Sequence, residues 1–218
     1  MDAAQDWRAV HEFWFPPGLD DADPATHRRM FGWWFGGGSD TGELRRFAPL
    51  VEAARTGRLD RWLATSLGRL SLILVLDQFP RGLFAGAPEA YASDPDALRV
   101  AEDGLRNGHY AALSTPWEKT FFLLPLAHAE GPDHQEQLER VVAMAAAIAR
   151  EAPERLRPLY EHSARQARGH LDVIARFGRF PHRNPILGRA STPEEIAYLE
   201  KGDFVHKRQP PSDPGPSG

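Results

Sequence analysis

The sequence contains no cysteine among its 218 residues. This absence excludes disulfide bonds, thiolate metal sites and a cysteine nucleophile. A metal site in this chain would have to use histidine, aspartate or glutamate. The sequence also lacks short metal-binding motifs, such as two histidines four residues apart with an adjacent glutamate.

Long apolar runs and a surplus of positive charge are missing as well. The longest apolar stretch, Leu70–Leu76, includes a serine and is much shorter than a membrane span, and the N-terminus lacks the basic and apolar regions of a signal peptide. The formal net charge of -4 leaves no basic surplus for neutralising phosphates. We therefore expect a cytoplasmic protein without membrane or nucleic-acid partners, in which any anion site is a local cluster.

No nucleotide-cofactor motif is present. The glycine run Gly36–Gly38 is neither preceded by a strand pattern nor followed by Gly-Lys-Ser or Gly-Lys-Thr. A flexible connection between helices is the better interpretation of this run.

Helical signals recur along the whole chain, and no period-two alternation bounded by hairpin turns interrupts them. The hydrophobic content of 42% suffices for one compact core. The sequence thus predicts an all-α, single-domain helical bundle or solenoid over residues 1–206. Residues 207–218 are rich in proline, glycine and serine and have little to bury, so they are predicted to form a disordered tail.

Several helix ends are marked by specific residues. Asp6 is a predicted N-cap for a helix that turns Val10 and Trp14 inward. Thr115 and Thr192 are each followed by proline and, three residues on, by glutamate, as in a capping box.

Two further helices matter for function. The stretch Leu67–Leu76 is apolar on nearly all sides and predicts a central buried helix that ends at residues 77–80, because proline disfavours helical geometry in the preceding residue. A long final helix is predicted over residues 158–177, ending at Gly178.

The segment that follows this long helix is the most informative of the chain. Nine residues, 176–184, contain three arginines, two phenylalanines, a histidine and an asparagine. Guanidinium groups bind carboxylate or phosphate in a bidentate manner, so this cluster is typical of an anion site. The plainer interpretation is a solvated helix face and loop arginines paired with acidic residues. The candidate ligand-binding residues here are Arg176, Arg179, Arg183 and Asn184, and His182 is a candidate general acid or base.

A second cluster, Asp77, Gln78 and Arg81, lies where the apolar helix is expected to end. A buried carboxylate must be paired, bind a metal or have a raised pKa. One interpretation is a functional site with Asp77 as a catalytic residue. The other is an ion pair between Asp77 and an arginine of residues 176–183, and the two are compatible.

The third cluster is His128 and Glu130, between two prolines. In an extended link these side chains could face one site, whereas in a helix residues two apart point away from each other. With Asp77, His170 and His182 they would offer the nitrogen and oxygen ligands that zinc, manganese or iron accept. A divalent metal is thus one hypothesis, and metal-free acid–base chemistry is the other. A histidine such as His170, on an apolar stripe, is more often a pocket-lining residue than a ligand.

Five separated motifs carry a resemblance to a known family. They are Val10–Phe15, Leu76–Arg81, Leu124–Glu130, Arg176–Asn184 and Leu187–Glu195. Together they resemble the bacterial family catalogued as domain of unknown function 924, over about residues 6–204. The resemblance implies an all-α fold similar to tetratricopeptide-repeat proteins and carries no activity with it.

The chain departs from that family pattern at four positions. The family commonly has asparagine and arginine where this chain has Gly82 and Ala85, arginine where it has Lys119, and serine where it has Ala129. Two polar groups near Asp77 are therefore missing, which would alter substrate preference or activity if they contact ligand in relatives.

Taken together, the three clusters predict an enzyme that acts on an anionic small molecule in one helix-lined pocket. Arginines would hold the anion, and His128 or His182, oriented by Asp77 or Glu130, would act as general acid or base. The alternative is a non-enzymatic, tetratricopeptide-like groove that captures an acidic peptide or a C-terminus. A purely structural ion-pair network is a third possibility. Tryptophans near the N-terminus would suit a homodimer patch, but core packing explains them more simply.

Overall fold

The computed structural model describes residues 6–35 and 42–202. Its α-helices are α1 (Trp7–Trp14), α2 (Pro24–Phe35), α3 (Ala48–Arg55), α4 (Ser66–Ile73), α5 (Phe79–Leu83), α6 (Asp94–Arg106), α7 (Pro116–His128), α8 (His134–Glu151), α9 (Arg157–Phe177) and α10 (Pro193–Lys201). A π-helical turn, η5 (Leu74–Gln78), joins α4 to α5, and the 3-10 turns are η3 (Gly42–Phe47), η4 (Asp60–Ala64), η6 (Pro88–Ala90), η7 (Glu154–Leu156) and η8 (Pro181–Arg183). Within the described ranges there is no strand, which confirms the all-α prediction.

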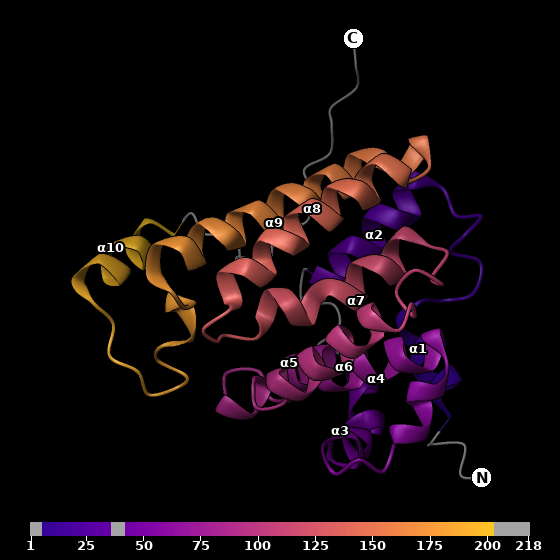
Figure 1. The fold of residues 1–218 in the computed structure, drawn as a ribbon, viewed down its shortest axis with the longest axis horizontal. Helices are drawn as coiled ribbons and strands as arrows, with labels where there is room; N and C mark the ends of the chain where they lie inside the picture. Colours follow the sequence, from indigo (N-terminus) through magenta and orange to yellow (C-terminus); the bar gives the residue numbers. More distant parts are fainter. Residues whose placement is uncertain (1–5, 36–41, 203–218) are drawn as a thin grey trace.

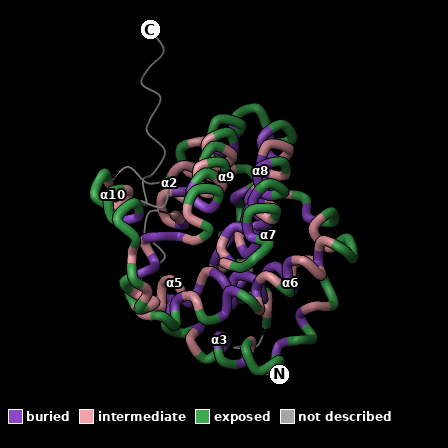
Figure 2. The backbone as a smooth tube through the Cα atoms, turned by 60° about the vertical axis from the view of Figure 1, so that its left-hand side comes forward, coloured by how far each residue is buried: buried purple, intermediate pink, exposed green. Residues whose placement is uncertain are grey.

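The helices form one compact domain. The long helices α8 and α9 pack side by side along one edge, with α7 next to α8 (Figure 1). On the other side, α7 packs against α4 and α6, and α1 packs against α4. Helix α10 lies beyond the C-terminal end of α9, at one extremity of the molecule (Figure 1). The buried backbone is concentrated in the middle of this arrangement, in α7 and its neighbours (Figure 2).

Aromatic side chains make up much of the core. The ring of Phe121 on α7 lies 5.5 Å from Trp14, 5.2 Å from Trp34 and 5.4 Å from Phe35. Trp14 and Trp34 are therefore core residues, as the simpler of the two interpretations of the N-terminal tryptophans predicts. The same packing fixes α1 and α2 against α7, because buried aromatic pairs combine a large apolar area with preferred ring geometry.

Four of the predicted helix ends agree with the structure. Asp6, Thr115 and Thr192 are N-caps whose side chains accept backbone N–H groups, and Thr192 with Glu195 completes a capping box. Gly178 ends α9 with a φ of 68°, a conformation that glycine adopts without strain.

The prediction that the buried helix ends at residues 77–80 was wrong. The chain continues through the π-helical turn into α5, and the N–H of Phe79 donates to the carbonyl of Leu74, five residues earlier. Pro80 is tolerated because it falls in the first turn of α5, where a missing N–H costs little. Such π-helical turns are frequent at functional sites. Here the turn buries Asp77 completely.

Close packing at Gly104 gives a first prediction. A Cβ atom at this position of α6 would lie 2.5 Å from Cδ of Arg69 and 2.5 Å from Cζ of Phe122, both buried side chains. We expect Gly104→Ala to lower the free energy of unfolding by about 1–3 kcal/mol in urea denaturation, although alanine favours helices. Gly131→Ala is the control, since a Cβ there meets nothing within 4 Å. Equal stability of the two variants would contradict this prediction.

Some sequence predictions lie outside the described residues or stay untested. The glycine run at 36–38 and the tail at 207–218 fall outside the described ranges. Across the part of the chain that is described, no helix has the length and apolar character needed to cross a bilayer. The domain boundary at residue 206, the likeness to tetratricopeptide-repeat folds, the cytoplasmic location and the homodimer stay predictions.

Candidate functional site

A cavity of about 420 Å³ lies among α2, α7, α8, α9 and the segments that follow α5 and α9. Two helices line it lengthwise. On α7 the lining runs from Thr120 to His128, and on α9 from Tyr160 to His170. At 1.5 Å per residue, each row is about 12–15 Å long. The cavity is therefore elongated, with different side chains at its two ends.

The polar end contains most of the predicted site. His128, Arg81 and Arg183 line the cavity there, together with Gln78, His170 and His182. Tyr91 completes this wall, with its ring 4.4 Å from the guanidinium carbon of Arg183. The sequence thus identified six residues that the fold brings to one end of one cavity.

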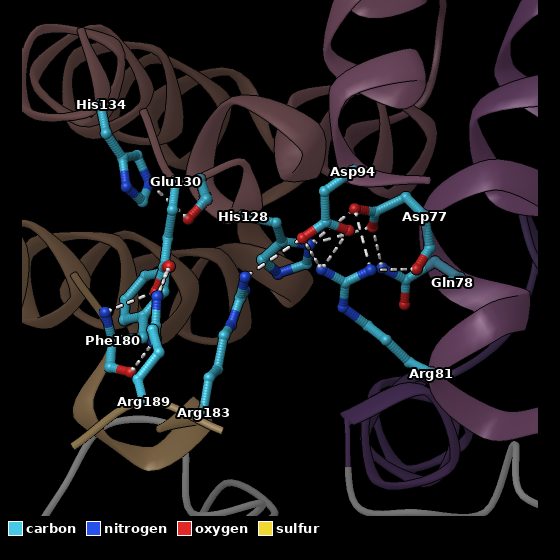
Figure 3. A network of polar contacts seen from close by, with 11 residues as sticks. Asp77, Gln78, Arg81, Asp94, His128, Glu130, His134, Phe180, Arg183 and Arg189 are labelled. Carbon is cyan, nitrogen blue, oxygen red and sulfur yellow. Dashed lines mark hydrogen bonds and ion pairs between the residues drawn. The ribbon is translucent and has the colours of Figure 1, made fainter. Parts of the chain in front are cut away.

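Two buried aspartates hold the two arginines of this end (Figure 3). The guanidinium of Arg81 lies 3.3 Å from Oδ1 of Asp77 and 2.9 Å from Oδ1 of Asp94, and it also donates to the backbone carbonyl of Asp77. Arg183 donates to Oδ2 of Asp94 over 3.1 Å. Asp94 is thereby shared between Arg81 on α5 and Arg183 on η8. This sharing joins two segments that are about a hundred residues apart in the sequence.

His128 is the second partner of Asp77. Its Nδ1 lies 2.8 Å and 3.0 Å from the two carboxylate oxygens, so Nδ1 carries the proton and donates, while Nε2 points away from Asp77 (Figure 3). Burial disfavours ionisation of Asp77, but the charge of Arg81 and the contact with His128 outweigh it and hold the pKa of Asp77 well below its usual value. For His128, burial outweighs the attraction of Asp77 and lowers the pKa. The ring is therefore neutral near pH 7, with Nε2 able to accept a proton.

Glu130 has a different position from the one expected for a catalytic residue. Its Oε1 accepts a hydrogen bond from the N–H of Phe180 over 2.7 Å, and its carboxylate pairs with Arg189. Arg189 in turn donates to the carbonyl of Phe180 over 3.2 Å and to Oδ1 of Asn184 over 2.9 Å. His128 and Glu130 do not share a partner, because His128 is still helical and Glu130 lies beyond the helix end. Glu130 and Asn184 thus shape the loop that presents His182 and Arg183.

Arg176 and Arg179 do not line the cavity either. Arg176 is exposed and pairs with Glu194, and Arg179 pairs with the buried Glu195 over 2.7 Å. The hydrogen bond from Arg179 lowers the pKa of Glu195 to about 2, so Glu195 is ionised throughout the physiological range. These two ion pairs fasten the end of α9 to α10.

The five candidate metal ligands are not gathered into one set. Asp77 and His128 bind each other, whereas Glu130 is taken up by Arg189 and Phe180. In the described part of the chain, no group of three or more histidine, aspartate or glutamate residues is placed to hold a metal ion. The arrangement can instead hold an anion against guanidinium groups and transfer a proton at Nε2 of His128.

The apolar end of the cavity was not predicted. Phe31, Trp34 and Phe35 of α2 line it, with Tyr160 packed on Phe31 at 5.5 Å and Ile148 of α8 nearby on the same wall. Periodicity marks such residues only as core, and core residues and cavity walls have the same pattern. Asp94 was also missed, because it resembles an ordinary acidic residue in the first turn of a helix.

Comparisons with known proteins agree with the fold and leave the chemistry open. The profile of a family described as bacterial protein of unknown function (DUF924) matches residues 10–203. A solved structure of a protein of unknown function, ATU0120 from Agrobacterium tumefaciens, is 36% identical, with a TM-score of 0.64, and the match covers 91% of this chain and 97% of that one. A comparison with curated proteins found no match. Because the family profile spans most of the sequence, this chain belongs to the bacterial protein family DUF924.

Proposed function

We propose that this protein is an enzyme that acts on an anionic small molecule, with His128 as general acid or base. The observation that carries the proposal is the pairing of His128 with buried Asp77 on the wall of the cavity. A carboxylate that holds Nδ1–H fixes the tautomer and the ring orientation, which leaves Nε2 as the proton acceptor. Arg81 and Arg183 supply the positive charge next to it.

Each residue has a separate role in this proposal. The anion lies against the guanidinium groups of the polar end, within reach of His128 and His182. His128 takes a proton from the substrate or from water at Nε2 and returns it in the protonated form, while Asp77 stabilises the imidazolium. Asp77 is a positioning residue, since it acts through His128 and Arg81.

The non-enzymatic alternative has less support. An acidic peptide would need several accessible cationic groups, and Arg176 and Arg179 are already paired with Glu194 and Glu195. The carboxylate of a C-terminus could still enter the polar end. Tight binding of acidic peptides without turnover of any small molecule would favour this alternative.

The proposal can be tested with small carboxylates in D₂O. We would incubate the protein with carboxylates that carry an ester, an amide, a lactone or an acidic C–H bond, and follow turnover and deuterium exchange by proton NMR. We expect the wild-type protein to transform at least one of them. His128→Gln should reduce that rate by about 100-fold or more, as removal of a general base does.

His11→Gln is the matched control. His11 also pairs with a carboxylate, that of Glu118 at 2.9 Å, but it does not line the cavity. The rate should stay within about twofold of wild type in this variant, and circular dichroism would verify that both variants are folded. Equal losses in the two variants, or no reaction with any compound, would contradict the proposed function.

A further inference from the structure

The polar end of the cavity leaves one buried cation incompletely satisfied. Arg183 is only 4% exposed, and its Nε atom has no hydrogen-bond partner among the described residues. Burial and the nearby charge of Arg81 both lower the pKa of Arg183, and Asp94, the carboxylate that it contacts, is shared with Arg81. A buried cation with an unpartnered donor is costly, and Arg183 lines the cavity, so a ligand oxygen against its guanidinium group would be stabilising.

The charge at this end disfavours a ligand with more than one negative charge. The guanidinium groups of Arg81 and Arg183 are balanced by the carboxylates of Asp77 and Asp94. A monoanion therefore adds one negative charge to a balanced, buried cluster, and a dianion adds two. Since each further unpaired charge in a buried site is costly, a carboxylate fits better than a phosphate monoester.

The opposite end would bind an apolar group. The rows on α7 and α9 both lead from the polar end, at His128 and His170, to the aromatic end, at Thr120 and Tyr160. The row on α9 includes the polar side chains of His162, Ser163 and Gln166, so the apolar wall is formed mainly by α2, α7 and α8. Here Phe31 and Trp34 face the cavity, and Ala145 and Ile148 continue the apolar wall on α8. A cavity about 12 Å long with one cationic and one apolar end matches an amphipathic molecule, which has a charged head group and an apolar body.

From this we infer that the ligand is an amphipathic monocarboxylate, with its carboxylate at Arg183 and Arg81 and its apolar chain extending along α7 towards Phe31 and Trp34. The inference rests on the proposed function in taking the polar end as the site of the anion. It adds the class of substrate, a carboxylic acid with a medium-length aliphatic or aromatic body. The free volume of about 420 Å³ accommodates such a molecule.

Calorimetric titration with fatty acids of increasing length tests the inference by binding alone. Butanoate, hexanoate, octanoate and decanoate would be titrated into wild-type protein, with 1-octanol and octyl phosphate as head-group controls. We expect Kd to fall about three- to fourfold per added methylene until the chain reaches the aromatic end. Octanoate should bind at least about tenfold more tightly than 1-octanol or octyl phosphate.

Variants at the apolar end provide the second measurement. Ala145→Phe, which fills the cavity, should weaken octanoate binding by at least about tenfold and change butanoate binding by less than about threefold. Ala143→Phe is the matched control, because Ala143 lies on the same helix but is exposed. Should Ala145→Phe fail to fold, Ile148→Ala is the second variant, and the enlarged cavity should move the optimum to a longer chain.

The outcomes separate this inference from the proposed function. Affinity independent of chain length, or equal binding of octanoate and 1-octanol, would overturn the inference even if short anions are turned over. Chain-length-dependent binding without turnover of any carboxylate would support the inference and contradict the enzyme. His11→Gln should leave octanoate binding within about threefold, since His11 does not line the cavity.

Discussion

Replacing Asp94 with alanine is expected to lower the free energy of unfolding by about 3–5 kcal/mol, a large part of the stability of a domain of this size. Asp94 is buried and lies 2.9 Å from the guanidinium of Arg81 and 3.1 Å from that of Arg183. Its removal leaves two buried cations with only Asp77 as a counterion. Urea denaturation monitored by circular dichroism would measure the loss.

Asp96→Ala is the matched control for this experiment. Asp96 lies in the same first turn of α6 and makes an exposed pair with Arg99, so its removal should cost less than about 1 kcal/mol. The double variant Asp94→Ala, Arg183→Met should recover part of the stability, because it also removes an uncompensated charge. Similar losses for Asp94→Ala and Asp96→Ala would show that the two arginines do not depend on Asp94.

Acidification is the second change with a large expected effect. His27 and His134 are almost completely buried, and burial lowers the pKa of both rings. In the unfolded chain histidine has a pKa of about 6.5. Below that pH the unfolded state binds protons that the folded state does not, so stability falls as the pH falls. The slope is up to about 1.4 kcal/mol per pH unit for each histidine.

The free energy of unfolding should therefore decrease between pH 7.5 and pH 5.5. Urea denaturation at pH 7.5, 6.5 and 5.5 would measure this decrease. The non-titrating variant His27→Gln should show a shallower slope, since it removes one of the buried histidines that bind a proton only in the unfolded state, although it is less stable at pH 7.5. A flat profile in the wild-type protein, or the same slope in the variant, would contradict the prediction.

The sequence revealed those parts of the site that stand out locally. Asp77, Arg81 and His128 are polar residues within apolar segments, and burying such residues requires partners, which made them candidates. His182 and Arg183 stand out because they follow a helix end that Gly178 defines. For these residues, composition and local geometry together indicated the polar wall of the cavity.

Partners that are far apart in the sequence could not be found in this way. Asp94 and Arg183 are 89 residues apart, and no spacing rule connects them. Arg176 and Arg179 belong to the same charged cluster as Arg183, but Glu194 and Glu195 return from α10 to pair with them. Local pattern shows which groups need a partner, and only the tertiary fold decides which partner each one has.

The π-helical turn at Leu74–Gln78 constrains the number of residues between α4 and α5 as well as their identity. A turn of this kind holds one residue more than an α-helical turn. Deleting any one of its residues would restore a regular α-helix and rotate everything that follows by about 100° relative to α4. That rotation would carry Arg81 away from Asp77 and Asp94 while the core face of α4 stayed in place. An insertion or deletion between Ser66 and Leu83 should therefore disrupt the polar end of the cavity even where every side chain of that end is kept.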